Sequence, residues 1–184
     1  MKKKEIVLGI TASIAAYKAP EIIKQLKKEG FEIEVIVTEN ATKFTSPLTL
    51  ETILQKRVYV DLFEQRHEFS PQHISLSEKA DLILISPATA CIIAKIAFGI
   101  CDDLLSCTIL ASKAPVIFCP AMNENMYKNR IIQENISKLK KLGYKFIPPI
   151  KGRLTCGKVG LGHLAEIETI VKEVKRQLHY RNYR

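Results

Sequence analysis

The chain has 184 residues, of which 47% are apolar and 26% charged, and its formal net charge is +9. This composition is typical of a soluble globular domain, and the length suffices for one hydrophobic core but is short for two. No apolar run approaches the roughly 18 residues that a membrane helix needs, and the basic start has no small-residue cleavage site. We therefore expect one cytoplasmic domain over residues 1–184, with no signal peptide and no membrane partner.

The positive charge does not by itself indicate a nucleic-acid-binding protein. The lysines fall mainly on the faces of predicted helices and near the C-terminus, with few aromatic residues among them. Nucleic-acid modules combine basic stripes with recognisable motifs, and the sequence contains none. We expect a solvated basic surface and no nucleic-acid partner, with phosphate-bearing small molecules as a second use of the charge.

Five cysteines lie at positions without the C-x-x-C or Cys/His spacing of a metal site, so we expect no bound metal. Cys91, Cys101, Cys107 and Cys119 lie among apolar or small residues, which favours buried thiols. Cys156 lies in a glycine-rich segment between basic residues. Such a thiol could act as an acid or nucleophile, although an incidental thiol on a flexible loop explains it about equally well.

Strands and helices alternate along the chain. Apolar or β-branched runs predict strands at 5–10, 31–38, 58–61 (weak), 81–86, 115–119 and 144–147. Helical periodicity predicts helices at 14–29, 47–55, 90–99, 102–111, 125–142 and 164–178. Residues 62–77 and 148–163 are predicted to be irregular loops. Because short apolar strands alternate with helices, the sequence predicts an α/β fold with a three-layer, doubly wound parallel sheet of the Rossmann or flavodoxin type.

Small and polar residues follow four of the predicted strands, at 11–14, 38–40, 86–92 and 120–123. Doubly wound folds bind their ligands at the carboxyl ends of the strands. The first segment lacks the G-x-G-x-x-G fingerprint of dinucleotide sites, so a mononucleotide such as FMN fits better than NAD, although a tight turn with nothing bound is also compatible. Asn123 could cap a helix or clamp a carboxylate, and a lone histidine such as His73 is more often structural than catalytic.

Five segments taken in order resemble the homo-oligomeric, flavin-containing cysteine decarboxylase family: GITASIAAYK, QHISL, SPATACIIAKIAFGICDDLL, PAMNENMY and RLTCGKVGLGH. Within that family the phosphopantothenoylcysteine decarboxylases of coenzyme A biosynthesis are most similar. The resemblance covers essentially the whole chain. It implies FMN bound at a subunit interface of a homotrimer, sometimes assembled further. It also implies a separate phosphopantothenate–cysteine ligase as a partner, because bifunctional relatives continue into a ligase domain where this chain stops.

The resemblance implies roles for individual residues. Cofactor contacts would come from Ala12, Ser13, Ile14, Thr38, Glu39, Asn40, Thr89, Ala90, Cys91, Ile92 and Ala121. The substrate would be bound by Asn123, Arg153, Leu154 and Thr155. His73 corresponds to the family's active-site histidine, and Cys156 to the cysteine that returns a proton and completes reduction. Three positions depart from the family pattern, where Cys91 replaces Asn, Tyr127 replaces Trp and Ala12 replaces Gly.

The implied reaction is FMN-dependent decarboxylation of 4′-phosphopantothenoylcysteine to 4′-phosphopantetheine. Direct loss of CO2 would leave an unstabilised carbanion. Oxidation of the cysteine side chain to a thioaldehyde provides an electron sink, so CO2 loss gives an enethiolate that is then re-reduced with a proton from Cys156. The alternatives are a peptide-cysteine decarboxylase and a non-catalytic FMN-binding regulatory subunit, since Cys91 removes a hydrogen-bonding amide from the flavin motif. The segment PAMNENMY and the Cys156 loop argue against flavin prenyl transfer.

Overall fold

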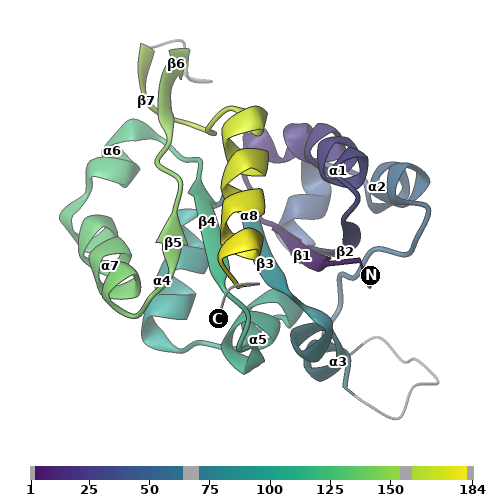
Figure 1. Cartoon of the computed structure of the whole chain (residues 1–184). Coiled ribbons are helices and arrows are strands. Elements are labelled where there is room, and N and C mark those ends of the chain that lie inside the picture. Colours follow the sequence, from purple (N-terminus) through teal and green to yellow (C-terminus); the bar gives the residue numbers. More distant parts are fainter. Residues whose placement is uncertain (1–2, 64–70, 154–158, 182–184) are drawn as a thin grey trace.

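A computed structural model describes residues 3–63, 71–153 and 159–181 (Figure 1). Five parallel strands form the main sheet: β1 (Glu5–Ile10), β2 (Glu32–Val37), β3 (Leu82–Ala88), β4 (Val116–Pro120) and β5 (Lys145–Phe146). Their order is β2-β1-β3-β4-β5, the flavodoxin-type order, in which the chain reverses direction across the sheet between β1 and β3. The predicted doubly wound parallel sheet is confirmed.

The remaining elements are helices and one separate hairpin. The helices are η1 (Ile14–Lys18), α1 (Ala19–Lys28), η2 (Glu39–Lys43), α2 (Pro47–Leu54), α3 (Gln72–Lys79), α4 (Ala90–Phe98), α5 (Leu104–Ala111), α6 (Glu124–Lys128), α7 (Arg130–Lys141) and α8 (Ile167–Arg181). The hairpin pairs β6 (Ile150–Arg153) with β7 (Val159–His163) in antiparallel fashion. It projects beyond the carboxyl end of the sheet (Figure 1).

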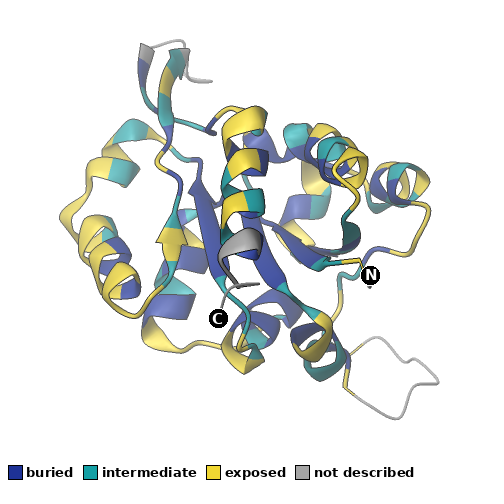
Figure 2. Cartoon of the chain, viewed as in Figure 1, coloured by how far each residue is buried: buried dark blue, intermediate teal, exposed yellow. Residues whose placement is uncertain are grey.

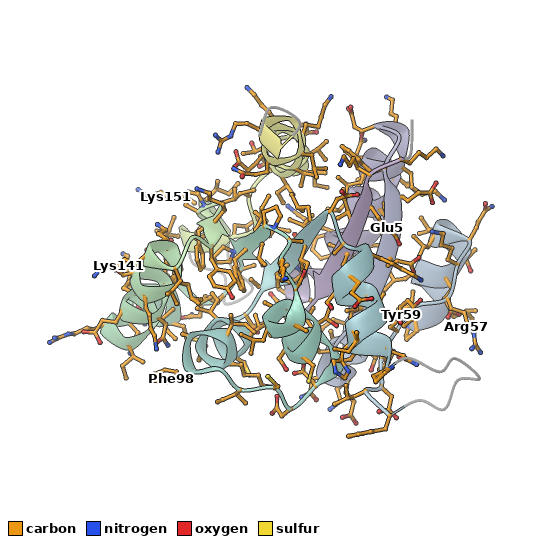
Figure 3. The ribbon with its side chains drawn as sticks, turned by 60° about the horizontal axis from the view of Figure 1, so that its bottom comes forward. Glu5, Arg57, Tyr59, Phe98, Lys141 and Lys151 are labelled. Atoms are coloured by element: carbon orange, nitrogen blue, oxygen red, sulfur yellow. The ribbon has the colours of Figure 1, made fainter. Side chains whose placement is uncertain are left out.

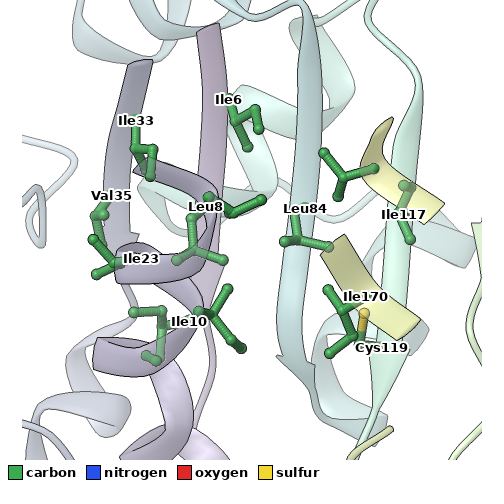
Figure 4. Packing of buried hydrophobic residues seen from close by; sticks show 14 of the residues in the cluster. Ile6, Leu8, Ile10, Ile23, Ile33, Val35, Leu84, Ile117, Cys119 and Ile170 are labelled. Carbon is green, nitrogen blue, oxygen red and sulfur yellow. The ribbon is translucent and has the colours of Figure 1, made fainter. Parts of the chain in front are cut away.

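One face of the sheet is covered mainly by α1 and α8. Alternate residues of β1, namely Ile6, Leu8 and Ile10, point to this face, where Ile23 of α1 and Ile170 of α8 pack over them and over the neighbouring strands (Figure 4). Each fully buried aliphatic side chain of this kind stabilises the fold by roughly 1.5–3 kcal/mol. Because side chains alternate along a strand, every second residue of β1 faces this layer and the residues between them face the other layer.

The other face is covered by α3, α4, α5 and α7. Val7, Ile83 and Phe118 belong to the cluster that packs against these helices. The Phe118 ring also stacks on Phe146 with 5.0 Å between ring centroids, which ties the short strand β5 to the core. Figure 2 shows β3 and β4 almost entirely buried, with the helices buried toward the sheet and exposed on their outer sides. The molecule thus has the three layers that the sequence predicts.

Two predicted helices differ in detail. The helix predicted over 14–29 begins as the 3-10 helix η1 and continues as α1, which has Pro20 in its first turn. The helix predicted over 125–142 is divided into α6 and α7. Asn129 breaks it with an extended backbone, and its side-chain oxygen accepts a hydrogen bond from the Ile131 N–H at 2.9 Å, which starts a new helix. The weak strand at 58–61 contributes one isolated bridge, between Tyr59 and Ile36.

Both predicted loops contain regular structure, so these predictions are wrong over the described residues. Within 62–77, helix α3 begins after Pro71, whose carbonyl accepts hydrogen bonds from the N–H groups of Ile74 and Ser75. Within 148–163, β6 and β7 pair with each other. Glycine-rich strands have low intrinsic β propensity, so their pairing depends on the hairpin and not on local sequence.

The cysteines are less buried than the sequence suggests. Cys119 is buried under α8, and this burial raises the pKa of its thiol to about 12, so it is protonated and inert. Cys91 and Cys101 are exposed and Cys107 is half-buried. The prediction of four buried thiols is wrong for these three, because they lie in the first turn of α4, in the α4–α5 loop and on the outer part of α5.

The basic side chains are dispersed over the surface. Figure 3 labels Arg57, Lys141 and Lys151, which are exposed and extend outward from three separate parts of the chain. This distribution agrees with the predicted solvated basic surface. Across residues 3–63, 71–153 and 159–181, no helix is long and apolar enough to span a bilayer.

Candidate active site

A pocket of about 550 Å³ opens at the carboxyl end of the sheet, where the segments after β1, β2, β3 and β4 meet. This volume lies within the roughly 300–1,000 Å³ range of small-molecule sites. The pocket is lined by Thr11, Ala12, Ser13, Thr38, Glu39, Asn40, Thr89, Ala90, Cys91, Ile92, Lys95, Asp102, Asp103, Ala121, Met122, Asn123 and Met126. It therefore occupies the switch-point position where doubly wound folds bind ligands.

The structure brings most of the predicted site residues together. Every predicted cofactor residue except Ile14 lines the pocket, and the predicted substrate residue Asn123 lines it too. The Ile14 side chain is 53% exposed. Arg153 ends strand β6, whereas Leu154, Thr155 and Cys156 lie outside the described residues.

His73, the predicted catalytic histidine, does not line this pocket either. It is half-buried in the first turn of α3, and α3 packs against α5. Figure 1 shows α3 at the opposite end of the molecule from the β6–β7 hairpin. A role for His73 in chemistry at such a pocket therefore requires a pocket other than that of its own chain.

The floor of the pocket is held by two hydroxyl groups that follow β1. Thr11 Oγ1 donates a hydrogen bond to the carbonyl of Pro87 at 2.8 Å and accepts one from the N–H of Thr89 at 3.0 Å. Ser13 Oγ donates to the carbonyl of Ala121 at 3.2 Å and accepts from the N–H of Ala15, which caps η1. These bonds connect the ends of β1, β3 and β4. Thr11 lies in a segment that sequence reasoning selected, but its hydroxyl was not assigned a role.

One wall of the pocket joins α4 to α5. Thr89 caps α4 by accepting a hydrogen bond from the Ile92 N–H. Further along α4, Lys95 Nζ lies 2.6 Å from Asp102 Oδ1 and 2.7 Å from Asp103 Oδ2. Burial works against the charged ammonium, but the hydrogen bonds that it donates to the two carboxylates outweigh this and raise the pKa of Lys95 well above its ordinary value.

Asp103 also begins helix α5. Its carboxylate accepts from the Ser106 N–H at 2.8 Å, and the Ser106 hydroxyl reaches back toward the Asp103 backbone in a capping box. Burial raises the pKa of Asp103, but the hydrogen bonds from Lys95 and Ser106 outweigh it and hold the pKa below its ordinary value. Sequence reasoning missed this group. The spacing of Cys91 and Lys95, four residues apart on one helix face, is the signal that places Lys95 on the pocket side.

Asn123 starts helix α6 at the edge of the pocket. Its Oδ1 accepts hydrogen bonds from the N–H groups of Asn125 at 2.9 Å and Met126 at 3.4 Å. Asn123 therefore caps helix α6, which is one of the two roles that the sequence predicts for it. Among the described residues, its Nδ2 makes no hydrogen bond, so this amide N–H is available as a donor.

The base of the β6–β7 hairpin lies against the same segment. The Met122 N–H donates to the Gly162 carbonyl at 3.1 Å. Gly162 has a φ of +148°, and a Cβ at this position would overlap with the Met122 carbonyl oxygen. A hydrogen bond from the Lys128 ammonium and, more weakly, one from the backbone N–H of Leu161 lower the pKa of the Glu124 carboxyl group. The hairpin is thus fixed to the segment that carries Asn123.

A family model described as Flavoprotein matches residues 1–179. The chain belongs to the flavoprotein family. Two curated members are similar over almost all of this chain. The coenzyme A biosynthesis bifunctional protein CoaBC of Borreliella burgdorferi is 45% identical over 99% of this chain and 46% of its own length. A probable phosphopantothenoylcysteine decarboxylase of Streptococcus mutans is 41% identical over 95% of this chain and 99% of its own length. The chain thus spans less than half of the bifunctional relative.

Solved flavoprotein structures share the fold. A mutant PPC decarboxylase complexed with pantothenoylaminoethenethiol superposes with a TM-score of 0.85 at 32% identity, covering 95% of this chain and 97% of the other. The FMN binding protein AtHal3 gives a TM-score of 0.81 at 32% identity, covering 95% of this chain and 96% of the other.

The pocket of this flavoprotein suits FMN. Flavodoxin-type folds hold FMN at the β1/β3 switch point, where this pocket lies. Small and apolar side chains, including Ala90, Ile92 and Met122, offer a surface for a flat ring. Ser13 and Thr38 precede η1 and η2, and short polar segments of this kind suit a ribityl phosphate. The residues present therefore fit the cofactor that the family name implies.

Proposed function

We propose that this chain catalyses FMN-dependent decarboxylation of 4′-phosphopantothenoylcysteine to 4′-phosphopantetheine. One observation carries the proposal. The pocket at the β1/β3 switch point gathers the segments that the cysteine-decarboxylase resemblance assigns to FMN, with Asn123 at its edge. The similarity to a probable phosphopantothenoylcysteine decarboxylase over almost the full length of both chains supports this substrate.

The proposed roles follow from the contacts. Bound FMN would supply a two-electron acceptor and donor for the cysteine side chain. The Asn123 amide, held by its cap bonds, presents an N–H donor to the substrate carboxylate. The hairpin that carries Arg153 is fixed next to the Asn123 segment by the Met122–Gly162 bond. Cys156, which lies between β6 and β7 in the sequence and outside the described residues, is proposed to protonate the product.

The proposed site is shared between copies of the chain. His73 lies away from the pocket of its own chain, so it would act in the pocket of a neighbouring copy. Exposed apolar residues on η1 and α2 support association: Ile14 is 53%, Tyr17 59% and Leu48 71% exposed. A homotrimer, or an assembly of trimers, is the proposed state. A separate phosphopantothenate–cysteine ligase as partner, like the cytoplasmic location, stays a prediction from sequence.

The proposal is tested by anaerobic incubation of the purified protein, loaded with FMN, with 4′-phosphopantothenoylcysteine. We expect CO2 and 4′-phosphopantetheine in equal amounts. A peptide with a C-terminal cysteine is the matched substrate for the alternative peptide-cysteine decarboxylase. FMN binding with no turnover of either substrate would instead support a non-catalytic flavin-binding subunit and contradict the proposal.

Sharing of the site between copies is tested by mixing two variants, neither of which should form 4′-phosphopantetheine alone. His73→Asn chains keep an intact Cys156, and Cys156→Ser chains keep an intact His73. If the two residues of one site come from different copies, mixed oligomers regain some complete sites and part of the turnover. Absence of any recovery, with mixing verified by tagged chains, would contradict the shared site.

A further inference from the structure

The Thr11 side chain is a buried connection between two strands that lies under the pocket. Only 2% of Thr11 is exposed, and its hydroxyl makes the two hydrogen bonds to Pro87 and Thr89 at 2.8 and 3.0 Å. A hydroxyl that donates once and accepts once in this way uses its single donor and one of its two acceptor lone pairs. The two hydrogen bonds therefore fix the hydroxyl relative to the backbone at Pro87 and Thr89.

These bonds lie where the regular pairing of the sheet ends. The pairing of β1 with β3 runs from Ile6↔Leu82 to Gly9↔Ile85 and goes no further. The pairing of β3 with β4 shifts register between Ile85 and Ala88. The stretch 86–89 is consequently not held by the β1 ladder. The Thr11 hydroxyl holds it on the β1 side, and the Ala121 N–H holds it on the β4 side through the Ala88 carbonyl at 3.1 Å.

The same stretch sets the position of the pocket wall. Thr89 is the N-cap of α4, and Thr89, Ala90, Cys91 and Ile92 line the pocket. A shift of the Thr89 N–H away from Thr11 would move the first turn of α4, including its free N–H groups, relative to the ligand. Small displacements of this kind weaken binding because the ligand contacts several groups of the turn at once.

We propose that Thr11 is a positioning residue of the flavin site, acting through the Pro87 carbonyl and the Thr89 N–H to fix the first turn of α4 against the cofactor. The identity of the ligand rests on the proposed function. The connection between Thr11 and the wall rests on the hydrogen bonds alone.

The test compares three variants of the full-length protein. Thr11→Val keeps the shape of the side chain but leaves the Pro87 carbonyl and the Thr89 N–H unpaired. Thr11→Ser keeps the hydroxyl. Thr108→Val is the matched control, because Thr108 is equally buried but donates to the Leu104 carbonyl within α5 and does not line the pocket.

FMN affinity is measured by fluorescence quenching during titration of apoprotein, together with the visible spectrum of the bound flavin. We expect Thr11→Val to bind FMN about tenfold to hundredfold more weakly and with an altered spectrum. Thr11→Ser should stay within about threefold of the unmodified chain, and Thr108→Val should bind unchanged. Unchanged affinity and spectrum for Thr11→Val overturn the proposal, as does an equal loss in Thr108→Val.

If Thr11→Val does not fold, amide hydrogen exchange on the unmodified apoprotein tests the same hydrogen bonds. The Thr89 amide should be protected to the degree of the β1 amides, because its acceptor is a buried hydroxyl. An unprotected Thr89 amide would contradict the proposal without any variant. If the unmodified chain binds no FMN, the proposed function fails, but the exchange measurement still decides whether Thr11 holds the wall.

Discussion

Gly162→Ala tests whether the hairpin and the Asn123 segment act as one unit. An added Cβ would overlap with the Met122 carbonyl oxygen and lie 3.3 Å from the Met122 carbonyl carbon. Both are backbone atoms, which cannot rotate away as a flexible side chain could. The least costly relief is movement of the hairpin base away from Met122, with loss of the 3.1 Å hydrogen bond between them.

The expected cost follows from two contributions. The φ of +148° is unfavourable for an L-residue with a side chain, and a left-handed backbone costs roughly 1–2 kcal/mol. Loss of one hydrogen bond adds about 0.5–1.5 kcal/mol. We therefore expect the free energy of unfolding, measured by urea denaturation, to fall by about 1.5–3.5 kcal/mol. Turnover should fall at least about tenfold because the hairpin leaves Asn123, while FMN affinity stays near that of the unmodified chain.

Gly99→Ala is the matched control. Gly99 ends α4 with a φ of +72°, and a Cβ there would meet nothing within 4 Å. Its cost should therefore be the backbone strain alone, about 1–2 kcal/mol, with no loss of turnover. Equal stabilities and equal turnover for the two variants would refute the close approach of Gly162 to Met122.

Three further predictions concern the wall of the pocket. Lys95→Met leaves the Asp102 and Asp103 carboxylates without their shared ammonium. The free energy of unfolding, measured in urea, should therefore fall by about 1 kcal/mol. An unchanged free energy of unfolding would contradict the pairing of Lys95 with the two carboxylates. The lowered pKa of Asp103 contributes stability that is fully present above the ordinary pKa of the carboxyl group and is lost as the pH falls through the lowered pKa. Thermal melts should thus show that Asp103→Asn is less stable than the unmodified chain at neutral pH and that this difference in stability disappears in acid. A difference in stability that does not depend on pH would contradict a lowered pKa of Asp103. Cys91→Asn restores the family's amide and should tighten FMN binding severalfold in titrations, and weaker binding would argue against an amide-bearing role at this position.

The sheet could be predicted because the hydrophobic pattern of each main strand is visible in its local sequence. The predicted strands at 81–86 and 115–119 contain the continuous apolar runs 82–85 and 116–119, which are typical of strands buried on both faces of a sheet. Most of the pocket could be predicted for the same reason, since the carboxyl ends of parallel strands meet at one edge. The polar residues after β1 to β4 do line a common cavity.

The features that could not be predicted depend on contacts between distant residues. Asn129 fits either a helix interior or a cap, and only the packing of α6 and α7 decides between them. The β6–β7 hairpin has weak strand propensity and is fixed by Met122. The group around Lys95 forms across the turn between two helices. The distance of His73 from the pocket follows from the path of α3 along the sheet.

The central claim is tested most directly by mass analysis of 4′-phosphopantothenoylcysteine after anaerobic incubation with the unmodified protein and with its Cys156→Ser variant. The account predicts CO2 from both. It predicts 4′-phosphopantetheine from the unmodified protein and, from the variant, an oxidised enethiol two hydrogen atoms lighter than that product. Unchanged substrate with the FMN-loaded unmodified protein, or complete conversion to 4′-phosphopantetheine by the variant, would contradict the account.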